Sequence, residues 1–89
     1  MDSINVLAEF FGTFLLLISI LATGNAFVIG GTLALVILLI GGVSGGHVNP
    51  AVSLAIFLKS GISAGELGLY VAAQLGGATA AYYVYNALM

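Results

Sequence analysis

The 89-residue sequence contains no cysteine, which excludes a disulfide framework, thiolate metal sites and a cysteine nucleophile. Lys59 is the only lysine or arginine, so the chain has no basic surface with which to bind nucleic acid. One histidine and three acidic residues are scattered along the chain, too few for a catalytic constellation or a metal site. The composition therefore predicts neither an enzyme nor a protein that holds a metal or a cofactor.

Charge of either sign is scarce, and apolar residues fill its place. Hydrophobic residues make up 62% of the chain and charged residues 4%. A soluble domain of this size must cover its surface with polar side chains, and this sequence does not contain enough of them. The chain is therefore predicted to be an integral membrane protein with lipid around it.

Three apolar stretches are candidates for membrane crossings, at residues 5–23, 26–40 and 64–88. A bilayer core needs about 20 apolar residues per helix, although a crossing can be somewhat shorter or longer. No lysine or arginine precedes the first stretch, so we expect a membrane helix there rather than a cleaved signal peptide. Residues 1–89 are thus expected to form one all-α, multi-pass membrane domain with three transmembrane helices.

The segment 41–59 ends in an apolar stretch that is too short to cross a membrane. Residues 41–48 are polar and rich in glycine, and Asn49 followed by Pro50 is typical of a helix start. The helix that follows is about half a bilayer long. Irregular backbone at membrane depth is tolerated only where protein buries it or where it lines a water-filled cavity. We therefore expect a re-entrant loop and half-helix, which enter and leave the membrane on the same side.

An alternative for this segment is an ordinary loop outside the membrane, followed by a helix lying on the membrane surface. Such an interfacial helix normally has a strongly charged face. Here Ser53 is the only polar side chain in the middle of the helix, so the re-entrant interpretation is favoured.

Three segments resemble one known family. Residues 44–52, SGGHVNPAV, resemble the first signature loop of the aquaporin and glycerol-facilitator family, while residues 8–14 and 70–77 resemble its first and third helices. The resemblance implies half of an aquaporin-like fold and the passage of water or small neutral solutes such as glycerol. Family members usually contain two such halves in inverted orientation, and only the first half is found here.

A single half-channel needs a partner, because unsatisfied loop amides are expensive in lipid. The economical solution is a second copy inserted upside down, which gives an antiparallel homodimer. With Lys59 as its only basic residue the chain has a weak positive-inside signal, which permits both orientations, although one fixed orientation is the other interpretation. The tetrameric packing of the family further implies four such pores, and so eight chains.

The predicted pore-lining residues follow from this dimer. The two Asn49 side chains are expected to meet near the centre, where each donates an amide N–H to a solute oxygen. Pro50 and Ala51 complete the signature and place a half-helix N-terminus there, whose dipole disfavours cations. Backbone carbonyls are expected to form a row of acceptors along the loop. These acceptors belong to Gly45, Gly46, His47 and Val48.

Two positions that narrow the pore in the family carry different side chains here. The resemblance places the family's aromatic filter residue at Ile29, 20 positions before Asn49, and its filter arginine at Val52. Neither side chain has the family's bulk or charge. A pore less stringent than that of the water-selective members is therefore expected.

Glu9 lies within the first apolar stretch and needs a partner, because a lone carboxylate in a membrane is expensive. The resemblance implies that Glu9 braces the signature loop by accepting backbone N–H bonds. Gln74 is expected either to do the same or to make a plain interhelical hydrogen bond. Small residues at Gly68, Ala72, Gly76 and Ala80 predict a close helix contact.

Three functions are compatible with the sequence. The first is a passive channel for water or small neutral solutes, built from copies of this chain. The second is a small dual-topology transporter that uses Glu9 as a proton-coupled site. The third is an accessory half that completes a pore with a different protein. The half-helix signature favours the first, since a proton-coupled transporter does not need it.

Overall fold

The computed structural model describes residues 3–89, which form four α-helices. Helix α1 spans Ser3–Thr23, α2 spans Ala26–Ile40, α3 spans Pro50–Leu58 and α4 spans Ala64–Leu88. No β-strand occurs within residues 3–89. The all-α class predicted from the sequence is confirmed.

Side-chain caps set where the helices begin. Asn49 Oδ1 accepts a hydrogen bond from Ala51 N at 2.8 Å, and Pro50 occupies the first position of α3, where its missing N–H costs nothing. At the start of α4, Ser63 Oγ accepts from Glu66 N at 3.1 Å, and Glu66 Oε1 accepts from Ser63 N at 2.9 Å. This reciprocal capping box satisfies two backbone donors that the helix itself leaves unpaired.

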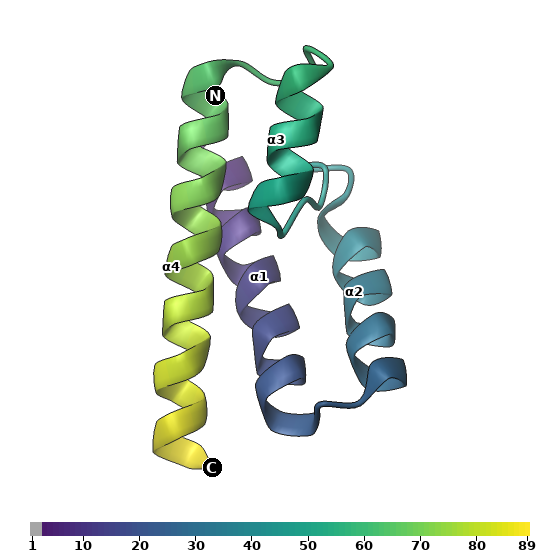
Figure 1. Ribbon diagram of the computed structural model, residues 1–89, viewed down its shortest axis with the longest axis vertical. Coiled ribbons are helices and arrows are strands. Elements are labelled where there is room, and N and C mark those ends of the chain that lie inside the picture. The colour runs from purple at the N-terminus through teal and green to yellow at the C-terminus, as the bar shows by residue number, and fades with distance from the viewer. Residues whose placement is uncertain (1–2) are drawn as a thin grey trace.

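The helices pack around α1. Helix α1 contacts both α4 and α2, α3 contacts α4, and α2 and α3 make no contact with each other. Figure 1 shows α1 and α4 running in the same direction, so that the two ends of the chain lie at opposite ends of the molecule. Beyond α2 the chain rises and then folds back, and α3 begins well inside the length of the molecule (Figure 1). The irregular segment is thus surrounded by helices rather than left at one tip.

Helices α1 and α4 approach each other closely at Gly77. A Cβ atom added to Gly77 would collide with the carbonyl oxygen of Phe10 and would lie 3.2 Å from Phe14 N, both of which are backbone atoms. Ala73 and Ala81, one turn away on either side, are buried on the same face. Small residues at four-residue spacing therefore allow the two backbones to touch.

The stripe of small residues predicted from the sequence lies beside this contact rather than in it. Gly68 and Ala72 are exposed, and a Cβ atom on Gly68 would have no neighbour within 4 Å. Gly76 touches only the Phe10 ring, and Ala80 is half-buried. Of the predicted stripe, Gly76 thus borders α1 and Gly68 does not, and the closest approach of the two backbones is at Gly77, because the helix carries small residues on more than one face.

Membrane crossing is supported by length and composition for one helix. Within residues 3–89, α1 alone is both long enough and apolar enough for a full span, with 21 residues. Helix α2 is apolar but has 15 residues. The number of three crossings expected from the sequence therefore stays a prediction.

Candidate functional site

The segment 41–49, here called the signature loop, has an unusual backbone conformation. Gly45, Gly46 and Val48 have φ angles of 93°, 62° and 46°. A left-handed conformation costs a non-glycine residue roughly 1–2 kcal/mol, and the branched side chain of Val48 makes it less favourable still. Val48 is nevertheless 4% exposed and firmly packed. Other contacts must therefore hold the loop in this shape.

The buried carboxylate of Glu9 supplies those contacts. Its Oε1 accepts hydrogen bonds from Val48 N at 2.8 Å and Gln74 Nε2 at 2.9 Å. Its Oε2 accepts from His47 N at 3.0 Å and from Ser44 Oγ at 2.6 Å. These four bonds fill the acceptor positions of a carboxylate, and the side chain is 0% exposed. Helix α1 thus holds the loop through two consecutive backbone amides.

A second set of contacts extends from Gln74 to the ring of His47. Gln74 Nε2 donates its second proton to Ser53 Oγ at 2.9 Å, and Ser53 Oγ lies 2.8 Å from His47 Nδ1. Ser53 and Gln74 are almost completely buried, and His47 is 8% exposed. Side chains from α1, α3, α4 and the loop therefore form one continuous polar cluster, which we call the bracing cluster. Its members are Glu9, Ser44, His47, Ser53 and Gln74.

Sequence reasoning placed Glu9 and Gln74 next to the loop but did not give a bracing role to Ser44, Ser53 or Tyr70. Tyr70 donates from its hydroxyl to the carbonyl oxygen of Ser44 at 2.7 Å, and its ring lies 4.8 Å from that of His47. Two signals were available. Tyr70 lies one turn before Gln74, and Ser53 is the only polar residue in the middle of α3.

Asn49 is positioned differently from the bracing cluster, because its side chain is exposed. The cap bond to Ala51 N uses its Oδ1, so the amide NH₂ group keeps both of its donors. No protein group within residues 3–89 accepts a hydrogen bond from that NH₂ group. Because Asn49 is the N-cap of α3, this free donor lies at the start of that helix, well inside the length of the molecule (Figure 1).

Four carbonyl groups of the signature loop are also free. Among the described residues, no N–H or O–H donates to the carbonyl oxygens of Gly45, Gly46, His47 or Val48. Gly45 is exposed, whereas the other three residues are buried. Unpaired backbone carbonyls at membrane depth occur where protein or water can reach them. Free amide donors and free carbonyl acceptors therefore lie within a few residues of each other.

The two predicted filter positions are not brought together within this chain. Ile29 is half-buried on α2, and Val52 is 40% exposed on α3. These two helices make no contact with each other. Neither residue carries a polar group, so neither adds to the hydrogen-bonding character of the site.

A buried carboxylate that organises a short irregular loop, with donors and acceptors left free beside the start of a short helix, is typical of a membrane channel. The chain belongs to the major intrinsic protein family, because the family model described as Major intrinsic protein matches residues 2–89. Members of this family are membrane channels for water or small solutes, and they are not enzymes. The resemblance seen in the sequence is confirmed, and the chain is an integral membrane protein. No solved structure matches it.

Proposed function

We propose that this chain is a half-channel and that two copies in antiparallel orientation form a passive pore for water and small neutral solutes. The observation that carries the proposal is the exposed amide of Asn49 at the start of α3, followed along the loop by unpaired carbonyls. A neutral solute with a hydroxyl group can accept from such an amide and donate to such carbonyls. The glycerol-like and water-like solutes of the sequence prediction both satisfy this chemistry.

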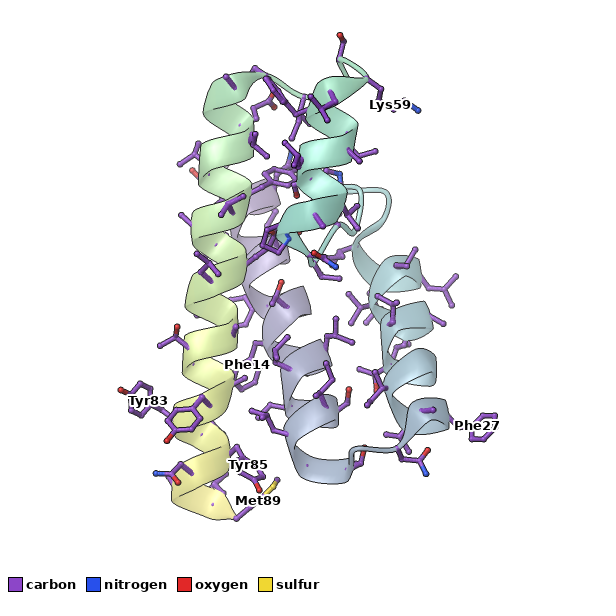
Figure 2. All side chains as sticks on the ribbon, viewed as in Figure 1. Phe14, Phe27, Lys59, Tyr83, Tyr85 and Met89 are labelled. Carbon is purple, nitrogen blue, oxygen red and sulfur yellow. The ribbon has the colours of Figure 1, made fainter. Side chains whose placement is uncertain are left out.

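Three crossings, by α1, α2 and α4, fit the dimensions of the molecule. Its longest extent is 39 Å, while the hydrocarbon core of a bilayer is about 30 Å thick. The 25 residues of α4 give a helix of about 37 Å. Lys59 lies near one end of the molecule, and Tyr83 projects outward from the half of α4 nearer the other end (Figure 2); charged and aromatic side chains favour the headgroup regions. On this proposal residues 1–89 form one half-channel domain with a re-entrant segment at 41–59.

The exposed apolar face of α3 supports the proposal that a second copy packs against it. Among the helices within residues 3–89, α3 contacts α4 alone, and Val52, Leu54 and Leu58 on its other faces are exposed. The free carbonyls of the loop belong to the residues that directly precede Asn49 and this helix in the chain. A second, inverted copy places the same half-helix opposite, so that two Asn49 amides and two helix dipoles meet. The positive ends of both dipoles repel cations.

Glu9 is better suited to bracing the loop than to carrying protons. Each of its oxygen atoms already accepts two hydrogen bonds, and none of its surface is exposed. Protonation would require at least one of these buried donors to lose its acceptor. This occupancy supports the channel over the proton-coupled transporter.

Vesicles provide the direct test of the channel. Purified protein in liposomes is expected to accelerate osmotic water flow and glycerol-driven swelling over bare lipid, with little ion conductance. Rates equal to those of bare lipid for every neutral solute would overturn the proposal. Swelling that requires a proton gradient would support the transporter instead.

The antiparallel arrangement predicts two populations of chains in one membrane. A short tag at either terminus is expected to be accessible from both sides, because Lys59 alone gives a weak orientation bias. Protease protection of intact and opened vesicles measures this. If each terminus is cut from one side only, the antiparallel dimer is wrong, although a pore with a different second half would still be tenable.

Val52→Arg is expected to restrict glycerol more strongly than water, since Val52 occupies the family's filter position and is exposed on α3. By the two-fold symmetry the substitution adds a long cationic side chain at both mouths of the pore. Val52→Met is the matched control, because it adds comparable length without charge. Swelling rates of correctly assembled Val52→Arg protein that equal those of Val52→Met would show that this position does not face the solute.

A further inference from the structure

The proton inventory of the bracing cluster is almost fully determined. Glu9 Oε1 accepts from Gln74 Nε2, so the amide of Gln74 must point its NH₂ group towards Glu9 and its second proton towards Ser53. Ser53 Oγ therefore accepts one hydrogen bond from Gln74. Its own hydroxyl proton still needs an acceptor, because the side chain is 0% exposed.

His47 Nδ1, at 2.8 Å, is the acceptor for the Ser53 hydroxyl within the described residues. If Nδ1 carried a proton instead, the buried Ser53 hydroxyl would be left without any acceptor among residues 3–89. Burying an unpaired hydroxyl is disfavoured strongly enough to set the tautomer by about tenfold or more. The geometry thereby selects the tautomer of the His47 ring that carries its proton on Nε2.

From this inventory we infer that Ser53, supported by Gln74, is a positioning residue that fixes His47 as its Nε2–H tautomer, and that this Nε2–H is a second solute-binding donor of the loop. No protein group within residues 3–89 accepts from Nε2, although His47 is 8% exposed. A Cβ atom on Gly45 would lie 3.0 Å from Nε2, and Gly45 is exposed at the edge of the loop. The uncommitted N–H therefore lies beside an exposed turn.

The ligand implied is a neutral oxygen acceptor, either water or the hydroxyl group of a small polyol. A solute at the loop then meets two donors in each chain, the amide of Asn49 and the ring of His47, in addition to the free carbonyls. This solute contact rests on the proposed channel function, whereas the tautomer does not. The two parts can therefore be tested separately.

His47 is the only histidine, so its ring nitrogens can be assigned without ambiguity. Nitrogen-15 NMR of the protein in lipid at neutral pH is expected to show a protonated Nε2 and an unprotonated Nδ1. Ser53→Ala is expected to remove the tenfold preference, while Thr79→Ala, which deletes an exposed hydroxyl bonded only within α4, is expected to leave it unchanged. A wild-type ring protonated on Nδ1, or on both nitrogens, would overturn the assignment. A preference that survives in Ser53→Ala would show that Ser53 does not set it.

Glycerol is the probe for the solute contact. Its addition to wild-type protein is expected to shift the Nε2 and Nε2–H resonances and to leave Nδ1 unmoved, whereas sucrose at equal osmolarity is expected to shift neither. If vesicles swell in glycerol but Nε2 does not respond, the second donor is wrong and the channel stands. If vesicles do not swell, the solute contact fails with the channel, and the tautomer is judged on the nitrogen spectrum alone.

Discussion

Glu9→Gln is expected to lower the stability of the folded protein by roughly 2 to 6 kcal/mol, because two buried donors lose their acceptor. A glutamine amide has one oxygen and one NH₂ group. In either orientation the NH₂ group faces a pair that includes a backbone amide, either His47 N or Val48 N. The loop then loses one of the two bonds that hold its left-handed conformation. Thermal denaturation in detergent and size-exclusion chromatography measure the loss.

Glu66→Gln is the matched control, since it makes the same chemical change at a capping box on the surface. Its expected cost is about 1 kcal/mol or less. Glu9→Gln protein that assembles as well as Glu66→Gln, and that loses only a pH-dependent component of uptake, would favour the transporter. Equal damage from both substitutions would mean that the bracing bonds contribute little.

Gly77→Leu is expected to separate α1 from α4 and to cost about 3 kcal/mol or more, through overpacking against backbone that cannot give way. The first atom of the new side chain already collides with the Phe10 carbonyl oxygen. Gln74, one turn earlier on the same face, would lose its position against Glu9. Loss of monodisperse protein and of the wild-type melting midpoint is the expected readout.

Gly68→Leu in the same helix is the comparison for Gly77→Leu. Its new Cβ atom meets nothing within 4 Å, and leucine has the better helix propensity, so unchanged or slightly raised stability is expected. Similar melting midpoints for the two variants would contradict the close contact between α1 and α4. A loss confined to Gly68→Leu would instead point to an interface on the opposite face of α4.

Much of the local structure follows from the sequence because short-range chemistry determines it. Asn49 and Pro50 specify the start of α3 through a cap and a fixed φ angle, and both depend only on neighbouring residues. The resemblance to the family also implied that Glu9 pairs with the loop, where a run of unpaired amides supplies donors for a buried carboxylate. The hydrogen bonds to His47 N and Val48 N match that expectation.

The face of α4 that packs against α1 could not be predicted, because small residues occur on several faces of this helix. Small residues recur every four positions on two neighbouring faces, one with Gly68 and Gly76 and the other with Gly77. Spacing alone therefore cannot say which face packs against α1. The face that turns inward is fixed by Tyr70 and Gln74, whose partners come from segments far away in the chain. Ser53 was noticed as a polar residue in α3, but its partners depend on how α3 packs against α4.

The parallel course of α1 and α4 bears on protein engineering. Because the chain leaves the molecule at the end opposite to where it enters (Figure 1), a tandem fusion with a short linker forces the second copy to start where the first one stops. With the three proposed crossings, that second copy runs through the bilayer in the reverse sense. In such a fusion the short linker alone makes the second copy inverted relative to the first. A linker long enough to recross the bilayer would remove that constraint.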